Sequence, residues 1–230
     1  MITSVKERGI IFSGEEVRAI LAGRKIQARR PVPRQARPVN EIDGWTMGQE
    51  PGDVGIFAGE LCRLMVSHGR DKAAAGELTP VKIKCPCQPG DLLYVRETLQ
   101  RTTERPGDWH PNTIPYYRYA ADNALVIRDG RYVQYDFRKK IIPSATMPKW
   151  ASRIWLEIVS VRAERIQAIT VADVLAEGYR DEIPHGFMTG QELQIHRRDL
   201  FVNSLNAKHP GSWDRNDWVF VLEFKRVERK

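Results

Sequence analysis

Residues 13–31, SGEEVRAILAGRKIQARRP, join a short helical pattern to a dense run of cations. Ser13 and Glu16 have the S-x-x-E spacing of a capping box, and three apolar residues follow at helical spacing. Gly23 is a typical helix stop. This pattern predicts a helix over residues 14–22, with the cations just beyond its end.

The net positive charge of the chain is concentrated around this stretch. Lys and Arg outnumber Asp and Glu by 36 to 29, which gives a net charge of +7. Residues 17–40 contain seven cations and no acid, so the rest of the chain is neutral. A patch of this kind attracts phosphate groups through a salt-dependent field. The charge indicates a contact for nucleic acid or a nucleotide, and a solvated basic surface is the alternative interpretation.

Several classes of protein do not fit the sequence. Of the three cysteines, Cys85 and Cys87 lack the spacing of a zinc or redox pair, so we expect reduced thiols and no metal. The five histidines are scattered, and neither a phosphate-binding glycine motif nor a G-x-S-x-G motif occurs. No apolar run resembles a signal peptide or a membrane span. We expect a cytoplasmic protein with no cofactor and no membrane partner.

Apolar patterns along the chain predict a mixture of strands and helices. Strands are expected at 9–12, 81–85, 92–97, 116–120, 125–135, 154–161 and 218–224. Helices are expected at 14–22, 171–177 and 191–207. Thr170 caps the second helix, and Gly178 follows its end. Residues 38–80, a possible hairpin or lid, and residues 101–145 are interpreted as insertions. The predicted fold is α+β, with a sheet that curls into a small barrel with flanking helices.

A set of segments spread over nearly the whole chain carries a resemblance to a known family. They are residues 11–14, 20–25, 90–91, 95–98, 147–153, 164–178 and 218–224. Their content and order resemble the ASCH domains, relatives of the PUA RNA-binding fold, in particular the version common in phage and prophage proteins. The resemblance implies a PUA-like β-barrel and a single ASCH domain over residues 1–230. It also implies a cleft in which Lys25, the strand of Arg96 and Glu97, and the helix of Glu177 converge.

The resemblance also raises the possibility of catalysis. Small ASCH enzymes that resemble this chain deacylate N4-acetylcytidine with a Lys, a Thr three residues later and a Glu on a later helix. Lys25 and Glu177 match the Lys and the Glu, but Ala28 occupies the Thr position and Ile26 offers no substitute. Nucleophilic catalysis needs a hydroxyl or thiol beside its base. Lys25 and Glu177 remain candidates for activating a water molecule, which is a different mechanism.

The candidate ligand contacts are mostly cations, with one carboxylate and two aromatic side chains. They are Arg24, Lys25, Arg29, Arg30, Arg96, Glu97, Tyr119, Trp150 and Arg153. Arginines suit bidentate phosphate binding, and aromatic rings suit base stacking. Glu97 is a candidate ion-pair partner of Arg96 or Lys25. The alternative interpretation is a set of solvated cations, structural ion pairs and core aromatics.

These observations predict a protein that binds RNA or a modified nucleoside or nucleotide in a basic cleft. One alternative is an amidohydrolase that acts on N4-acylated cytidine through a water activated by Lys25 and Glu177. Another is an adaptor that binds a host protein through residues 38–80.

Overall fold

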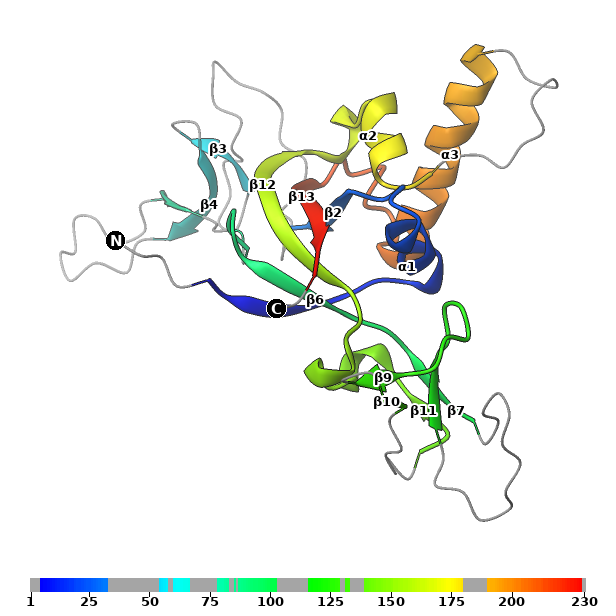
Figure 1. Cartoon of the computed structure of the whole chain (residues 1–230). Helices are drawn as coiled ribbons and strands as arrows, with labels where there is room; N and C mark the ends of the chain where they lie inside the picture. The colour runs from blue at the N-terminus through cyan, green and yellow to red at the C-terminus, as the bar shows by residue number, and fades with distance from the viewer. Residues whose placement is uncertain are drawn as a thin grey trace, which may run out of the picture. The chain divides into compact units, whose positions relative to one another are not determined.

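The computed structural model describes residues 5–32, 54–57, 60–66, 78–82, 85, 87–102, 116–128, 131–132, 139–179 and 190–228. They form a five-stranded mixed sheet and three α-helices, so the predicted α+β class is confirmed. The sheet has the order β1 (Glu7–Ile11), β6 (Leu92–Arg96), β12 (Trp155–Arg165), β13 (Trp218–Val227) and β2 (Gln27–Pro31), as labelled in Figure 1. In the described part of the chain, no pairing between β1 and β2 closes this sheet into a barrel.

The chain divides into two compact units. The first comprises residues 1–26, 89–159 and 224–230, and the second comprises residues 27–88 and 160–223. The first contains α1 (Gly14–Leu21), and the second contains α2 (Val171–Ala176) and α3 (Gly190–Lys208). Among the described residues, no helix is long and apolar enough to cross a membrane.

Helix α1 begins and ends where the sequence predicts. The Ser13 hydroxyl accepts from the backbone N–H of Glu16 at 3.3 Å, and Glu16 Oε2 accepts from the backbone N–H of Ser13 at 2.9 Å. This reciprocal pair satisfies two N–H groups that a helix start leaves without partners. Gly23 has a φ of 67°, the left-handed conformation that glycine adopts at little cost. The backbone N–H groups of Arg24 and Lys25 then both donate to the Ala19 carbonyl, at 2.8 and 3.1 Å, which fixes the turn.

The first unit contains two further groups of short strands besides its part of the main sheet. A three-stranded sheet has the order β11 (Ile141–Ile142), β7 (Leu99–Thr102) and β8 (Tyr116–Tyr119). Strands β9 (Ile127–Arg128) and β10 (Arg131–Tyr132) form an antiparallel pair. Short 3-10 helices follow β11, η1 (Ser144–Thr146) and η2 (Lys149–Ala151). The strand predicted at 116–120 is confirmed. The described part of the strand predicted at 125–135 contains two short paired strands, and residues 101–102 of the predicted insertion at 101–145 continue β7.

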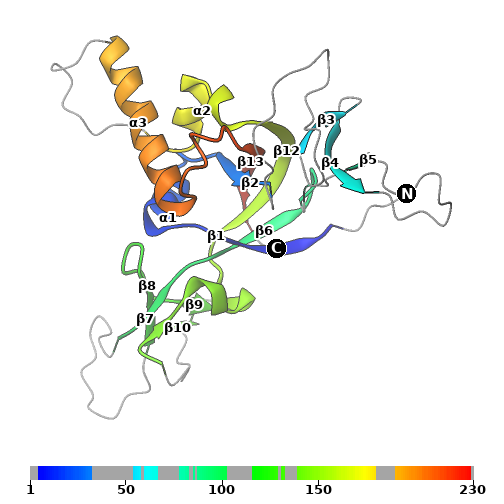
Figure 2. The ribbon, with the colours of Figure 1, turned by 180° about the vertical axis from the view of Figure 1, so that it is seen from behind.

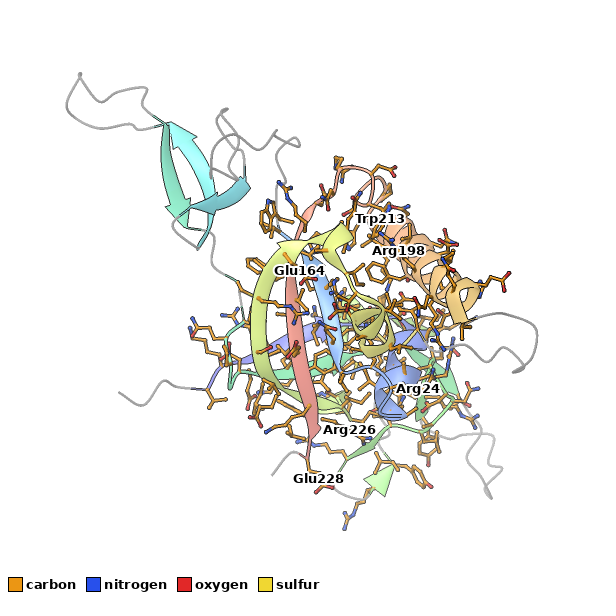
Figure 3. All side chains as sticks on the ribbon, turned by 90° about the horizontal axis from the view of Figure 1, so that it is seen from above. Arg24, Glu164, Arg198, Trp213, Arg226 and Glu228 are labelled. Atoms are coloured by element: carbon orange, nitrogen blue, oxygen red, sulfur yellow. The ribbon has the colours of Figure 1, made fainter. Side chains whose placement is uncertain are left out.

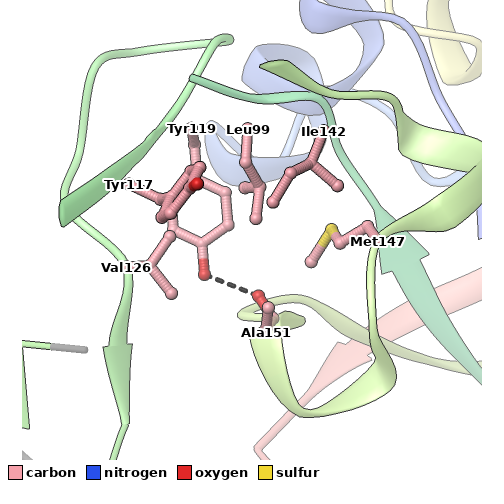
Figure 4. Packing of buried hydrophobic residues seen from close by; sticks show 7 residues of the cluster. All are labelled: Leu99, Tyr117, Tyr119, Val126, Ile142, Met147 and Ala151. Carbon is pink, nitrogen blue, oxygen red and sulfur yellow. Dashed lines mark hydrogen bonds between the residues drawn. The ribbon is translucent and has the colours of Figure 1, made fainter. Parts of the chain in front are cut away.

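A small apolar core holds these strands against η2. Its buried residues are Leu99, Tyr117, Tyr119, Val126, Ile142, Met147 and Ala151, shown in Figure 4. The Tyr119 hydroxyl donates to the Ala151 carbonyl at 2.7 Å, so its polar end is satisfied inside the core. Trp150 is partly buried and packs against the outside of this cluster.

The second unit places α2 and α3 beside the β2–β13 pair (Figures 1 and 2). Helix α2 begins with a second capping box, formed by Thr170 and Asp173, and Gly178 follows it with a φ of 95°. The core consists of Ile166, Ile169, Val174, Phe201, Leu205, Val219 and Val221. The helices predicted at 171–177 and 191–207 and the strand predicted at 218–224 are therefore confirmed.

Strand β2 was not predicted, although its residues were singled out for their charge. It pairs antiparallel with β13, so that Ala28 lies opposite Leu222 and Arg29 opposite Val221. Part of the predicted insertion at 38–80 also forms strands: β3 (Val54–Phe57), β4 (Glu60–Val66) and β5 (Leu78–Lys82) make an antiparallel sheet. The remainder of that insertion lies outside the described residues.

Candidate functional site

A network of charged side chains surrounds Arg29 in the second unit. The Arg29 side chain is only 2% exposed. Its guanidinium donates to Glu164 Oε1 from Nε at 3.1 Å and from Nη2 at 2.6 Å, and to Glu177 Oε1 from Nη1 at 3.2 Å. Asp173 Oδ2 lies 3.4 Å from Nη2. Carboxylates from β12, where Figure 3 labels Glu164, and from both ends of α2 therefore converge on one buried cation.

Asp173 joins the helix cap to this network. Its Oδ2 accepts from the backbone N–H and the hydroxyl of Thr170, at 3.0 and 2.7 Å. Its Oδ1 accepts from Gln27 Nε2 at 3.1 Å. Partial burial opposes ionisation of Asp173, but the hydrogen bonds from Thr170 and Gln27 and the charge of Arg29 together lower its pKa to about 2. Asp173 is therefore ionised across the physiological pH range.

Arg162 extends the network toward the surface. It donates to Glu164 Oε2 at 3.1 Å, to Asp173 Oδ1 at 3.0 Å and to Glu223. Hydrogen bonding from the Ser160 hydroxyl, together with Arg162, lowers the pKa of Glu223. The network thus contains two arginines, Arg29 and Arg162, and four carboxylates, a formal charge of −2. The buried Arg29 therefore adds no positive surface to the chain.

The residues beside Arg29 on β2 differ in exposure. Ala28, at the position where the resemblance leads us to expect Thr, is 1% exposed. Arg30 is half-buried. Burial of His209 lowers the pKa of that imidazole, and the charge of Arg30 lowers it further. Of the seven cations in residues 17–40, Arg34 and Arg37 lie outside the described residues.

In the first unit, Lys25 is buried and Arg24 is not. Lys25 is 2% exposed, with Nζ 3.5 Å from Glu16 Oε1 and 5.7 Å from the centroid of the Phe12 ring. Glu16 therefore caps α1 with one oxygen and contacts Lys25 with the other. Arg24 is half-buried, and its side chain makes no hydrogen bond or ion pair with any described residue. Figure 3 labels it beside α1.

A second charged cluster in the first unit brings three of the predicted residues together. Arg153 donates to both oxygens of Glu97, from Nε at 2.9 Å and from Nη2 at 2.7 Å. It also donates to Asp122 Oδ2 at 2.7 Å, and its guanidinium carbon lies 3.8 Å from the centroid of the Tyr119 ring. Glu97 therefore pairs with Arg153 and not with Arg96 or Lys25, the partners suggested by sequence.

Burial shifts the titration of this cluster. It raises the pKa of Glu97, an effect that the hydrogen bonds and charge of Arg153 oppose without cancelling. Burial also raises the pKa of Tyr119, and the nearby charge of Glu97 adds to the shift. Although burial favours neutral arginine, hydrogen bonds to Glu97 and Asp122 raise the pKa of Arg153. Because Tyr119 is only 2% exposed, its ring cannot stack a base of a ligand.

Arg96 and Trp150 make other contacts in the first unit. Arg96 Nη1 donates to the Ala145 carbonyl at 2.9 Å, so this cation fixes the chain around η1. Trp150 is half-buried, with the Arg128 guanidinium 5.8 Å from its ring centroid.

The structure groups the predicted residues within each unit. Arg29 and Glu177 meet in the second unit, and Glu97, Tyr119 and Arg153 meet in the first. The convergence of Lys25 with Glu177 stays a prediction, because these two residues belong to different units.

Sequence reasoning missed four of the carboxylates and one arginine. They are Asp122, Arg162, Glu164, Asp173 and Glu223. A signal for part of this set was present, because Ser160, Arg162 and Glu164 alternate along a strand and so share one face. A polar face on an apolar strand needs polar partners.

No group of three or more His, Cys, Asp or Glu side chains could hold a metal ion in the part of the chain that the structure describes. Comparison with protein-family models, with curated proteins and with solved structures found no match to this chain.

Proposed function

We propose that this chain is an ASCH-type, PUA-like domain that binds RNA or a modified nucleoside or nucleotide. The observation that carries the proposal is the difference between Arg24 and Ala28. The position where a catalytic hydroxyl is expected holds a buried methyl group, whereas the half-buried Arg24 has no partner among the described residues. The segment lacks a nucleophile and retains a cation for an anionic ligand.

Lys25 and Glu177 each take part in a charge pair. Lys25 lies beside Glu16, and Glu177 accepts from Arg29, each inside its own unit. Both candidate catalytic groups therefore have a structural function in the arrangement described. Replacing a member of a buried charge pair usually destabilises a protein. Loss of activity in a Lys25 or Glu177 variant would thus be poor evidence for catalysis.

Arg24 is well placed to contact a phosphate. Its backbone is fixed by the N–H bond to Ala19 and by the left-handed Gly23. A guanidinium on a fixed backbone loses less entropy when it forms a bidentate contact than one on a mobile chain. Ile26, two residues later, is exposed and offers an apolar surface nearby in the sequence.

The finer parts of this proposal rest on the sequence resemblance. They are the small PUA-like barrel, the phage or prophage origin and the cytoplasmic location. The mixed sheet with its three helices supports the first of these only at the level of an α+β fold.

Binding of a fluorescein-labelled oligouridylate of about 12 nucleotides, a length within the range of single-strand binding sites, tests the proposal. Affinity is measured by anisotropy across a salt series. Each phosphate contact on a single strand contributes about 0.7 to the slope of log K against log salt, so Arg24→Gln should weaken binding about fivefold at 0.1 M salt. The matched control is Arg8→Gln, because Arg8 is exposed on β1 and has no side-chain partner among the described residues. Equal affinities for Arg24→Gln and Arg8→Gln would contradict the assignment of Arg24.

A nucleoside assay separates binding from hydrolysis. The native chain is titrated with cytidine and N4-acetylcytidine by calorimetry, and deacetylation is followed by chromatography. We expect no turnover above a control without protein, because Ala28 supplies no hydroxyl. Turnover would favour the amidohydrolase alternative. Absence of binding to both RNA and nucleosides would refute the proposed function.

A further inference from the structure

The β9–β10 hairpin of the first unit places two arginines directly opposite each other. Arg128 pairs with Arg131, and Ile127 pairs with Tyr132, so each pair shares one face of the hairpin. Both arginines are exposed. Two guanidinium groups on the same face of a hairpin can donate to one anion together.

Trp150 lies on the arginine side of this hairpin. The Arg128 guanidinium is 5.8 Å from the centroid of its ring, and β9 contacts η2, the short helix that carries Trp150. The indole packs against the apolar core around Tyr119 and Ala151, which fixes its position, while part of the ring stays accessible. The hairpin and η2 thus present two cations and one anchored aromatic ring together.

The surroundings of the hairpin are also basic. Between positions 99 and 151 the printed sequence has nine cations and five acids. Asp122, an acid of this stretch, accepts from Arg153, and Lys149 is paired with Glu7. The described cations of the stretch are Arg101, Arg118, Arg128, Arg131, Lys139, Lys140 and Lys149. This basic region is separate in sequence from the cations of residues 17–40.

We propose that Arg128, Arg131 and Trp150 form a contact for single-stranded RNA, and this inference rests on the proposed function. The two guanidinium groups bind a backbone phosphate, and the indole stacks on an adjacent base. Arginine binds phosphate through paired N–H donors, and an aromatic ring stacks on any base. The strand must be single because the bases of a duplex are already stacked on each other. The site is additional to Arg24 and requires none of the family-like catalytic residues.

Charge complementarity favours RNA over a protein or membrane partner. The surface combines exposed guanidinium groups with one flat ring, which matches alternating phosphates and bases. The apolar pair of the hairpin, Ile127 and Tyr132, lies on its opposite face, and Tyr132 makes an edge contact with Tyr116 at 6.3 Å between ring centroids. Among the described residues of the hairpin, the arginine face therefore offers no broad apolar area for a protein or a lipid chain.

The test uses the full chain and the same labelled oligouridylate. Loss of the shared phosphate contact in the double variant Arg128→Gln/Arg131→Gln should reduce the salt slope by about 0.7 and the affinity about fivefold at 0.1 M salt. The control is Arg8→Gln/Arg226→Gln, which removes the same charge at two other exposed positions of the first unit; Arg226 is labelled in Figure 3. The control should lose much less affinity.

Trp150 is tested with two substitutions that keep an apolar side chain against the core. Trp150→Leu removes the stacking surface and should weaken binding roughly 5- to 150-fold, whereas Trp150→Phe should retain most of the affinity. Thermal unfolding identifies any variant that fails to fold. If the Trp150 variants fail to fold, the Arg128→Gln/Arg131→Gln variant decides the test. A duplex of the same sequence should compete poorly with the single strand.

The outcomes distinguish this inference from the proposed function. If RNA binds and Arg24→Gln weakens it, but both double variants bind equally well, the hairpin site is refuted and the proposed function stands. If the arginine variant weakens binding but Trp150→Leu and Trp150→Phe are equal to the native chain, base stacking is refuted. If the native chain binds no RNA, the hairpin inference fails with the RNA proposal.

Discussion

Replacing Arg29 by Met is expected to lower the free energy of unfolding by about 3–5 kcal/mol, the usual cost of removing one partner of a buried ion pair. Its side chain is 2% exposed, and its removal leaves Glu164, Asp173 and Glu177 without their shared cation. Met keeps an unbranched apolar stem, so the change acts mainly on charge and hydrogen bonding. At about 2–4 °C per kcal/mol for a chain of this size, the melting temperature should fall by roughly 6–20 °C.

Arg162→Met is the matched control for this prediction. Arg162 binds Glu164 and Asp173 as Arg29 does, but its side chain is 38% exposed. Solvent-exposed ion pairs contribute about 0–1 kcal/mol, so this variant should stay close to the native chain. Urea unfolding followed by circular dichroism gives both free energies. Adding Glu177→Gln to Arg29→Met should recover part of the loss, because it removes the charge of the buried carboxylate that accepts from Arg29 in the native chain. If Arg29→Met costs no more than Arg162→Met, the buried network does not stabilise the fold and the reasoning is refuted.

Two further predictions concern the cluster around Arg153. Tyr119→Phe leaves the buried Ala151 carbonyl without its donor, so we expect a loss of roughly 1–3 kcal/mol in urea unfolding, and stability equal to the native chain would contradict this. Burial raises the pKa of Glu97 above its ordinary value of 4.5, so its contribution to stability is complete below 4.5 and is lost as the pH rises through the raised value. The native chain should therefore gain stability relative to Glu97→Gln as the pH is lowered from neutrality to 4.5. Urea unfolding of both chains along that pH series checks this. A difference in free energy of unfolding that stays constant with pH would contradict it.

Local chemistry allowed the helix starts to be predicted from sequence. The pairs Ser13 with Glu16 and Thr170 with Asp173 are three residues apart and form their capping boxes without distant partners. The glycines at 23 and 178 end both helices for the same local reason, a left-handed backbone. Long apolar runs such as residues 218–224 also identify a buried strand by themselves.

Strand β2 was missed because its partners are distant in sequence. Its residues, QARRP, show no apolar alternation, yet Gln27, Ala28 and Arg29 are all buried. The carboxylates that allow burial of Arg29 are 135 and 148 residues away, on β12 and at the end of α2. A cation run therefore predicts exposure unless the acids that will surround it can be located in space. For the same reason the sequence identified Lys25, Arg29 and Glu177 as notable residues without giving their partners.

The acidic residue of each capping box caps its helix and also contacts a buried cation. Fraying of the helix start is thereby coupled to the loss of a charge contact. Glu16 closes the start of α1 and contacts Lys25, while Asp173 closes the start of α2 and contacts Arg29. If the first turn of either helix frays, the carboxylate moves and a buried cation loses a counterion at the same moment. Helix ends are normally the first parts of a protein to exchange their amide hydrogens. Here fraying carries an added electrostatic penalty, so both helix starts should be more rigid than their short lengths suggest.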